Sequence, residues 1–360
     1  MAQPPSPPRV LHVITDPRRR GAQRLARDLH AELLRRGRPS ALRALAPHPD
    51  ATGPAEATGV LGPSRYHRAT LRALLGAARR ADVVVAHGSS TLAACAVALA
   101  GTGVPFVYVG IGDPRHWSAD RARRLLVGLR LRRCSAVTAL THGAREVLLE
   151  HFPLDPRRVV TIPNARAADR YPPAADPAER SAARTLLGLP GQGPLVAWVG
   201  ALAAGKRPDL ALTVTAALPG VHLALAGAGP LRVAAGARVT LLGELADPAP
   251  LYRAADALLL TSDSEGLPGV LIEAALAGLP CAATDVGWVR EIVRDGVTGA
   301  LAPAGDAPAL RAALAAVLAG AGPLGSAARH HALRRFDLAQ VTDRWQELLL
   351  AVARGRPVGE

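Results

Sequence analysis

Two carboxylates and several glycines lie close together in the segment Ser262–Pro280, SDSEGLPGVLIEAALAGLP. Glu265 precedes an apolar run typical of a helix, and Glu273 follows eight residues later, within that run. The unpaired backbone N–H groups at the start of a helix form an anion site, and Gly266 and Gly269 let a ligand approach the backbone. A carboxylate beside such a site suits a ligand with both phosphate and hydroxyl groups.

A structural interpretation of the same residues is also open. In that interpretation Glu265 only complements the dipole at an ordinary helix start, and Glu273 is solvated or lies at the edge of the core. The spacing of the two carboxylates does not decide between the two interpretations, whereas the longer pattern around them favours the first.

That longer pattern resembles the carboxyl-terminal half of the family 4 retaining glycosyltransferases, enzymes of the GT-B fold that use nucleotide sugars. The family signature is a Glu, seven residues and a second Glu, then Gly-x-Pro, a strand, a Gly turn, Glu and a Gly-rich turn, and it matches residues 265–299. Other segments resemble the family in order, and the resemblance covers nearly the whole chain: Val10–Gly37, Asp82–Ser90, Leu195–Leu212, Leu223–Arg232 and Leu241–Gly266. It implies an α/β chain of two facing, doubly wound Rossmann-like domains with a cleft between them.

The resemblance also implies roles for single residues. Glu265 would contact the donor sugar near the reacting carbon, Glu273 the ribose hydroxyls, and Lys206 the diphosphate. His87 matches a histidine at the cleft rim and is a catalytic candidate. The other implied donor-binding positions are Gly21, Arg207, Leu245, Gly266, Gly269 and Val270.

The chemistry that the family uses explains these residue types. Breaking a glycosyl–phosphate bond builds charge on the leaving diphosphate, and fixed cations and amides stabilise that charge most in the transition state. Attack is usually explained as front-face, with the leaving phosphate accepting the acceptor's proton. The sequence has no Asp-x-Asp motif before the cleft and no spacing typical of metal ligands, so we expect neither a catalytic metal nor a cofactor besides the nucleotide-sugar donor.

Several positions depart from the family. Ala201 stands where an Arg is usual, so either Arg207 supplies the charge or the pocket has one cation fewer. Ile111 stands where many members have a His, and either Asp113 or His116 is the candidate replacement. These two departures motivate an alternative, a non-catalytic sugar-nucleotide-binding or scaffolding protein. Arg18, Arg19 and Arg20 before the Gly21 loop either bind an acidic acceptor or are simply solvated.

The elements that position these residues alternate between short apolar strands and longer helical patterns. Uninterrupted apolar strands favour a parallel sheet covered on both faces. The Pro-rich stretch Pro163–Pro177 interrupts the alternation and is interpreted as a linker. We therefore predict an acceptor-side domain over residues 1–165 and a nucleotide-sugar domain over residues 166–337, with a closing helix at 338–355 that packs back onto the first.

The positive charge belongs to one half of the chain. The 43 basic residues are 42 Arg and one Lys, Lys206, and the net charge of +14 divides into +15 for residues 1–170 and −1 for the rest. An Arg-rich amphipathic segment, Arg115–Arg133, suits an anionic membrane surface and a lipid-linked or envelope acceptor, or is an ordinary helix with a solvated face. Aromatic residues make up only 3%, which argues against nucleic-acid binding.

Cysteines and hydropathy suggest the compartment. Cys95, Cys134 and Cys281 are scattered and odd in number, which indicates a reducing, cytoplasmic environment, with peripheral contact at the inner face of the plasma membrane as an extension. Val83–Gly112 has no charged residue but contains glycines and a proline, so it is predicted as strand, helix, turn and strand rather than as a membrane span. The sequence leaves the sugar, the base (UDP- or GDP-sugar) and the acceptor (glycan, lipid or small molecule) open.

Overall fold

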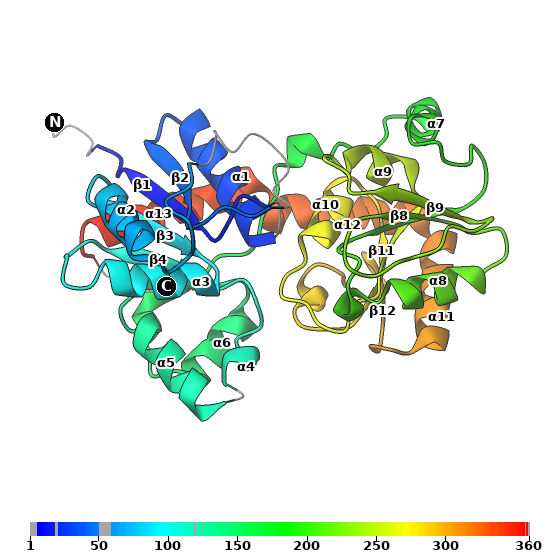
Figure 1. Cartoon of the computed structure of the whole chain (residues 1–360). Coiled ribbons are helices and arrows are strands. Elements are labelled where there is room, and N and C mark those ends of the chain that lie inside the picture. Colours follow the sequence, from blue (N-terminus) through cyan, green and yellow to red (C-terminus); the bar gives the residue numbers. More distant parts are fainter. Residues whose placement is uncertain (1–5, 19–20, 50–58, 119, 357, 359–360) are drawn as a thin grey trace. The chain divides into compact units, whose positions relative to one another are not determined.

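The computed structural model describes residues 6–18, 21–49, 59–118, 120–356 and 358, and the chain divides into two compact units (Figure 1). Unit 1 comprises residues up to Asn164 together with those from Leu338 onward, and unit 2 comprises Ala165–Asp337. The predicted closing helix is α13 (Leu338–Ala353), which packs on α1 (Gly21–Arg35) in unit 1.

Unit 1 is built on a six-stranded parallel sheet of order β2-β1-β3-β4-β5-β6. Its strands are β1 Val10–Ile14, β2 Ser40–Ala44, β3 Val83–His87, β4 Phe106–Val109, β5 Ala136–Ala139 and β6 Val159–Thr161. Its other helices are α2 Arg68–Ala78, α3 Ser89–Ala98, α4 Arg115–Ser118, α5 Arg121–Leu131, α6 His142–His151 and the 3₁₀ turn Pro156–Arg158.

Unit 2 repeats the design with the sheet order β12-β11-β10-β7-β8-β9, again all parallel. Its strands are β7 Leu195–Val199, β8 His222–Ala226, β9 Val239–Gly243, β10 Ala257–Leu260, β11 Cys281–Thr284 and β12 Gly299–Ala302. Its helices are α7 Pro177–Leu186, α8 Pro208–Ala216, α9 Ala249–Ala254, α10 Gly269–Leu276, α11 Ala307–Ala319 and α12 Ala321–Phe336, with 3₁₀ turns at Ala168–Arg170, Ala204–Lys206 and Val289–Glu291.

Apart from His12 in β1 and His87 in β3, the central strands are largely apolar, as expected for sheets that helices cover on both faces. Every residue of β1, β3 and β10 is buried, as the uninterrupted apolar runs predicted. In unit 2 the core joins β7, β8 and β10 to the apolar faces of α8 and α11. The expectation of two doubly wound α/β halves is confirmed.

Each sheet has a point at which the strand order reverses. In unit 1 the chain runs from β2 back past β1 to β3, and in unit 2 it runs outward from β7 to β9 and then returns to β10 beside β7. Ligands of doubly wound folds bind beyond the carboxyl ends of the strands at such a reversal, because the two loops there diverge and leave a crevice. The loops after β7 and β10 are therefore where unit 2 should hold its ligand.

The stretch predicted as a linker, residues 163–177, begins at the boundary between the two units and is ordered on unit 2. The backbone of Arg166 forms an isolated parallel β-bridge with that of Asp337, and its N–H donates to the carbonyl of Phe336 at 3.0 Å. Tyr171 is fully buried. Pro177 belongs to α7, where Asp176 caps the helix. Proline fixes the backbone but does not prevent burial of the residues between prolines, and this segment is an ordered strap on unit 2.

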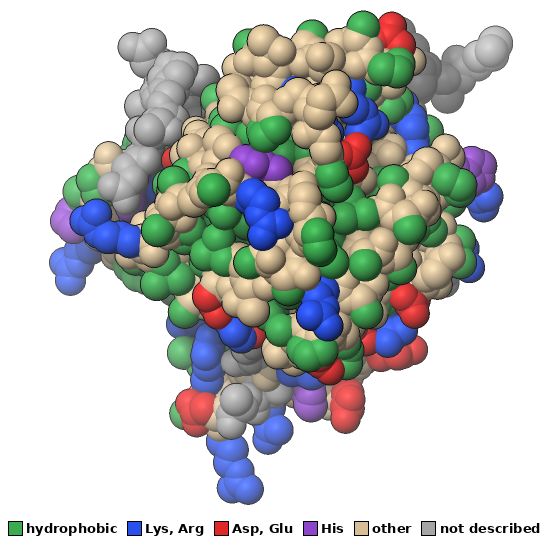
Figure 2. All heavy atoms as spheres, turned by 90° about the vertical axis from the view of Figure 1, so that its right-hand side faces the viewer, with side chains coloured by type: hydrophobic (Ala, Val, Ile, Leu, Met, Phe, Trp, Pro, Cys, Tyr) green, Lys and Arg blue, Asp and Glu red, His purple; other side chains and the backbone are tan. Residues whose placement is uncertain are grey.

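Among the described residues, no single helix is long and apolar enough to cross a membrane, although α11 and α12, which meet at 94°, pass the same test of length and composition as a pair. The uncharged segment 83–112 forms β3, α3 and β4, as predicted. On the face shown in Figure 2, basic and acidic side chains are interspersed rather than gathered into a single patch.

Candidate functional site

The loops after β7 and β10 bring the only lysine of the chain to the first signature carboxylate. Lys206 Nζ lies 2.5 Å from Glu265 Oε1, and Ser262 Oγ donates a hydrogen bond of 2.7 Å to the same oxygen. The Glu265 side chain is 10% exposed and that of Lys206 is 34% exposed, so the pair lies at the surface of unit 2 without being fully solvated. A cation and a carboxylate thus meet where the reversal of strand order predicts a ligand.

Buried hydrogen bonds fix the backbone that carries Lys206. The hydroxyl of Thr261, at the end of β10, lies 2.8 Å from the carbonyls of both Lys206 and Arg207, and Trp198 Nε1 donates to the same hydroxyl at 3.0 Å. Arg207 has a φ of 50°, the one positive φ of a non-glycine residue in the described chain. Such a conformation costs about 1–2 kcal/mol for an L-residue, so the loop is held by its surroundings.

A tight turn after β11 supports Glu265 from behind. Gly287 has a φ of 55°, and a Cβ added there would lie 1.8 Å from the carbonyl oxygen of Glu265. The N–H of the next residue, Trp288, donates to the carbonyl of Gly266 at 3.2 Å. Glycine is therefore required at residue 287 both by the backbone conformation and by the close approach of the Glu265 loop.

Gly287→Ala is expected to lower the thermal midpoint of unit 2 and to displace Glu265. The matched control is Gly296→Ala, because Gly296 has a φ of 69° but open space where a Cβ would be added. Both variants carry the cost of a left-handed alanine, of about 1 kcal/mol, so their difference in calorimetric unfolding isolates the contact with Glu265. Equal midpoints for the two variants would show that the Gly287 turn does not support the loop.

Glu273 lies in α10 with its carboxylate inside unit 2. Its side chain is 1% exposed, Arg166 Nε donates to Oε1 at 2.7 Å, and Tyr252 OH donates to Oε2 at 2.9 Å. The expectation of a solvated or core-edge residue is therefore wrong. The predicted contact with ribose hydroxyls stays a prediction, and any such contact has to be made by a carboxylate that two buried donors already orient.

The other predicted donor-binding residues of unit 2 lie in segments that follow strands of the same sheet. Gly266 lies in the loop after β10, Gly269 and Val270 begin α10, and Leu245 lies in the loop after β9. The guanidinium of Arg207 pairs with Asp209 at 2.9 Å and with Asp263 at 3.4 Å. Two carboxylates thus share its charge in this structure, and its role in place of the arginine missing at Ala201 stays a prediction.

In unit 1, His87 is buried at the end of its strand, and its catalytic role stays a prediction. It is the last residue of β3 and is 1% exposed. His12 is paired in register with Val85, so His87 lies two residues further along on the same face. His12 Nδ1 is 3.0 Å from His87 Nε2, and burial lowers the pKa of His87 to about 3 and that of His12 well below its usual value. Both rings are neutral at pH 7.

The remaining unit 1 candidates lie near the carboxyl ends of their strands. Asp113 accepts a hydrogen bond of 3.0 Å from the backbone N–H of Arg115 at the start of α4, which is a structural contact, and its catalytic role stays a prediction. Gly21 is the first residue of α1 and is exposed, with open space where a Cβ would be. Arg19 and Arg20 lie outside the described residues, whereas Arg18 pairs with Asp16 at 2.8 Å.

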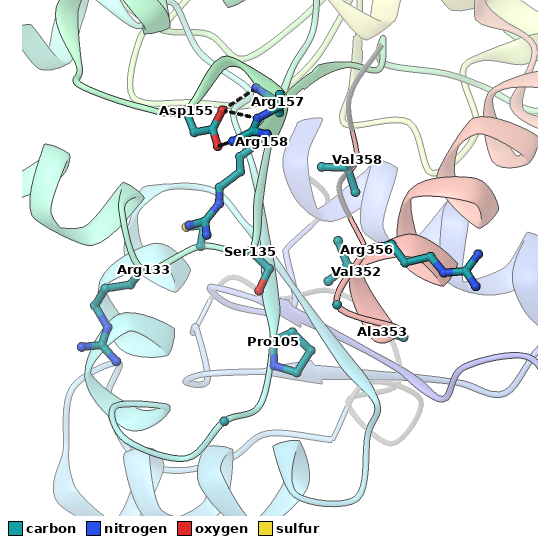
Figure 3. Close-up of a pocket in the computed structure, with 13 residues that line it drawn as sticks. Pro105, Arg133, Ser135, Asp155, Arg157, Arg158, Val352, Ala353, Arg356 and Val358 are labelled. Atoms are coloured by element: carbon teal, nitrogen blue, oxygen red, sulfur yellow. Dashed lines mark hydrogen bonds and ion pairs between the residues drawn. The ribbon is translucent and has the colours of Figure 1, made fainter.

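A cavity of about 640 Å³ in unit 1 lies away from all of these residues. Figure 3 shows it beside the residues that precede β4 and β5, with Arg158 pointing inward and Arg157 paired with Asp155. These are the amino ends of the strands, opposite the edge at which ligands of such folds bind. The cavity therefore lies at the opposite edge of the unit 1 sheet from His87, Asp113 and Gly21.

Three buried partners of the candidate residues escaped the sequence analysis: Arg166 and Tyr252 in unit 2, and His12 in unit 1. Arg166 lies in the stretch interpreted as a linker, and Tyr252 lies within the apolar pattern of α9. A polar residue in an otherwise apolar strand was the available signal for His12. The other two are recognisable only when the partners that bury them are known.

Comparison with known proteins gives two matching families. The family described as "Glycosyltransferase Family 4" matches residues 19–170, and the family described as "Glycosyl transferases group 1" matches residues 193–320. Similar curated proteins include D-inositol 3-phosphate glycosyltransferase of Mycolicibacterium paratuberculosis, 36% identical over 200 residues (51% of this chain, 44% of the relative), and that of Geodermatophilus obscurus, 33% identical over 220 residues (54% and 48%). The matched part spans less than half the length of these relatives.

Solved structures agree on the fold. The Anabaena protein Alr3699/HepE, solved in complex with UDP-glucose, is similar with a TM-score of 0.82 at 21% identity, over 96% of this chain and 100% of that one. WaaG, a glycosyltransferase involved in lipopolysaccharide biosynthesis, is similar with a TM-score of 0.73 at 18% identity, over 94% and 99%. Glycosyltransferase families thus match both halves of this chain in order, and the solved structures share its two-domain α/β architecture, the GT-B fold.

Proposed function

We propose that the protein transfers a sugar from a nucleotide-diphosphate sugar to an acceptor with retention of configuration. The observation that carries the proposal is the Lys206–Glu265 pair of 2.5 Å at the reversal of strand order in unit 2, in the loop that leads into α10. A diphosphate bound there would meet the ammonium group and the first amides of α10, and the sugar would meet the Glu265 carboxylate.

Each group has a separate task in this reaction. Lys206 and the amides of Gly269 and Val270 stabilise the charge that builds on the leaving diphosphate. Glu265 orients the sugar hydroxyls and stabilises positive character at the anomeric carbon. The leaving phosphate accepts the acceptor's proton, so the reaction needs no general base from unit 1, which is compatible with the buried, neutral state of His87.

The charge of the chain and the names of similar proteins indicate which donors and acceptors to test first. UDP-sugars are the first donors to test, because the HepE structures hold UDP-glucose or UDP with glucose, and GDP-sugars are second. Relatives named for D-inositol 3-phosphate make a phosphorylated cyclitol a candidate acceptor beside lipid-linked and envelope glycans. The excess of +15 in residues 1–170 favours an acidic acceptor of either kind.

The test is a calorimetric panel of UDP, GDP and ADP, followed by mass spectrometry of products with each sugar donor and with inositol 3-phosphate or lipid extracts as acceptors. We expect one nucleotide to bind and its sugar to be transferred with retained configuration. If a nucleotide binds but neither sugar transfer nor donor hydrolysis is detected, the non-catalytic alternative is favoured. If none of the three nucleotides binds, the proposal is overturned.

We further propose that α5 contacts an anionic membrane surface on the cytoplasmic side. Leu125, Leu126 and Leu129 are 67%, 48% and 52% exposed, and arginines flank them on the same helix. Trp117, in the preceding helix α4, packs on Tyr108 with ring centroids 5.9 Å apart and is not part of this exposed face. Exposed leucines between cations are the features that bind a helix to the interface of an anionic bilayer.

Sedimentation with vesicles tests this contact. Vesicles of phosphatidylglycerol and phosphatidylcholine are expected to bind the protein more strongly than phosphatidylcholine alone, and Leu125→Glu with Leu129→Glu should lower the bound fraction at least fivefold. The control is Leu186→Glu on α7, since Leu186 is 73% exposed but lies in unit 2. Equal binding of all three proteins would show that α5 does not contact the bilayer.

A further inference from the structure

Arg166 is a charged residue enclosed in unit 2. Its side chain is 3% exposed, Nε donates to Glu273 Oε1 at 2.7 Å, and Nη1 donates to the carbonyl of Ala165 at 2.7 Å. Its backbone is fixed too, through the β-bridge with the backbone of Asp337 and the 3.0 Å hydrogen bond from its N–H to the carbonyl of Phe336. The guanidinium therefore has a single, well-defined position relative to α10.

The guanidinium also lies against the first residue of α10. A Cβ added to Gly269 would lie 2.0 Å from Arg166 Nη2, so only a glycine at that position admits this arrangement. A cation beside the positive end of a helix is unfavourable by itself, and Glu273, one turn further along the same helix, supplies the compensating charge. Gly269, Arg166 and Glu273 form one interlocked set.

Tyr252 completes the set from α9. Its hydroxyl donates to Glu273 Oε2 at 2.9 Å, and its ring packs on that of Tyr171, with ring centroids 6.1 Å apart. Each oxygen of the Glu273 carboxylate thus has its own buried donor. A carboxylate oxygen accepts more than one hydrogen bond, so this carboxylate can be held in one orientation and also accept a hydroxyl from a ligand.

Burial of an ion pair is a weak source of stability, because removing both charges from water costs several kcal/mol per ion before their attraction is counted. Replacing such a pair by apolar side chains is often neutral or stabilising. What a fully hydrogen-bonded pair does provide is a fixed geometry. The site of this pair, on the helix whose start is the predicted phosphate site, indicates what that geometry serves.

We propose that Arg166 and Tyr252 are positioning residues that orient Glu273 so that the site distinguishes ribose from deoxyribose in the nucleotide. The inference rests on the proposed function, since it requires a nucleotide at this site. Neither residue contacts the ligand. Both act through the Glu273 carboxylate, and Arg166 also acts through the position of Gly269 at the start of α10.

The experiment compares the dissociation constants of UDP and 2′-deoxy-UDP by calorimetry on the full chain, or of the corresponding GDP or ADP pair if that base binds. A hydrogen bond to a charged group changes affinity about 10- to 100-fold, and we expect wild-type protein to prefer the ribonucleotide by about that ratio. Tyr252→Phe should lower the ratio at least threefold, and Arg166→Met should abolish it.

The matched control is Thr215→Val. Thr215 is a buried residue of unit 2 whose hydroxyl donates to the carbonyl of Ala211 at 2.8 Å, on α8 and with no bond to Glu273. The Thr215→Val substitution removes a buried hydroxyl, as Tyr252→Phe does. It should lower the thermal midpoint while leaving the preference for the ribonucleotide intact. Arg166→Lys should restore part of the preference that Arg166→Met loses, because it keeps the charge but not the guanidinium fork.

The outcomes separate this inference from the function on which it rests. If the protein binds the ribonucleotide and its preference is unaffected by Tyr252→Phe and Arg166→Met, this inference alone is overturned. The Arg166–Glu273 ion pair would then have a structural role only. A wild-type chain that binds none of the three nucleotides overturns the proposed function and the inference with it. In the supporting outcome, preference falls in the Tyr252 and Arg166 variants and persists in Thr215→Val.

Discussion

Lys206→Met is expected to lower the rate of sugar transfer about 10²–10³-fold, the loss typical of one fixed group that stabilises a developing negative charge. Lys206 Nζ lies 2.5 Å from Glu265, and Thr261 holds the backbone of the loop. The ammonium group is therefore placed before the donor arrives. Its attraction for the diphosphate grows as the glycosyl–phosphate bond breaks, which is why the loss should appear in kcat.

Lys206→Arg should also impair turnover, by at least about tenfold. A guanidinium is planar and larger than an ammonium group, and the two are not equivalent as point charges on a phosphate. The space beside Glu265 is shared with the hydroxyl of Ser262, 2.7 Å from the same oxygen. In a chain with 42 arginines and one lysine, near-normal activity of Lys206→Arg would make the single lysine an accident.

Steady-state kinetics with saturating acceptor measure both Lys206 variants, and calorimetry of the nucleotide separates binding from turnover. The control is Asp209→Asn, which removes an exposed ion pair with Arg207 from the same loop and should change kcat less than threefold. Thermal unfolding of each variant shows whether the unpaired Glu265 has unfolded the loop. A Lys206→Met enzyme with wild-type kcat would exclude the proposed role.

Acid is expected to destabilise unit 1 steeply, because two histidines are buried there without charge. Burial is the largest cause of the lowered pKa of both His12 and His87, and the pKa of His87 falls to about 3. In the unfolded chain both titrate near pH 6.5. Below that pH the unfolded state binds protons that the folded state does not, so stability is complete above about pH 6.5 and falls as the pH drops toward 3.

The size of this effect follows from linkage. Each such histidine contributes a slope of about 1.4 kcal/mol per pH unit between its unfolded and folded pKa values. Over two pH units His87 alone would remove roughly 3 kcal/mol, a large share of the 5–15 kcal/mol that stabilises a typical protein, and the lowered pKa of His12 adds to this loss in the same direction. His12 Nε2 and His87 Nδ1 have no hydrogen-bond partner within the described part of the chain, so protonation there would bury an unpaired donor as well.

Urea unfolding at pH 7.5, 6.5, 5.5 and 4.5 measures the slope, with hydrogen exchange at β1 and β3 to assign it to unit 1. His12→Gln with His87→Gln should flatten the slope, even if it lowers stability at pH 7.5. His67→Asn is the control, because His67 is an exposed residue whose side chain caps α2 and asparagine also caps helices. A slope unchanged by the double substitution would show that other groups cause the acid lability.

The sequence predicted the central strands closely, because β3, β7, β10 and β11 are continuous apolar runs with turn residues on either side. The edge strands β2 and β12, whose sequences are SALRA and GALA, have mixed burial and show no such run. In α12, the Gly, Pro and His residues obscure a helical period.

The candidate site shows a similar division. Lys206 and Glu265 lie 59 residues apart yet were both predicted, because the loops that carry them follow strands and match a family motif. The surroundings of Glu273 were not predictable. Arg166 lies 107 residues away from Glu273 in the chain. Only the folded structure shows that the segment carrying Arg166 packs against α10. Local sequence patterns therefore indicate which residues could bind or react with a ligand. The side chains that orient those residues come from distant parts of the chain and are seen only once the chain is folded.

The Lys206–Glu265 pair has a spectroscopic consequence. Since the chain has one lysine, reductive methylation with ¹³C-formaldehyde would add one dimethylammonium resonance besides that of the amino terminus. A methylated Nζ beside a carboxylate reports on that neighbour through its chemical shift. Titration with a nucleotide would move this resonance as phosphate replaces Glu265, so occupancy of the site can be followed in a lysate, without an assay for the sugar or the acceptor.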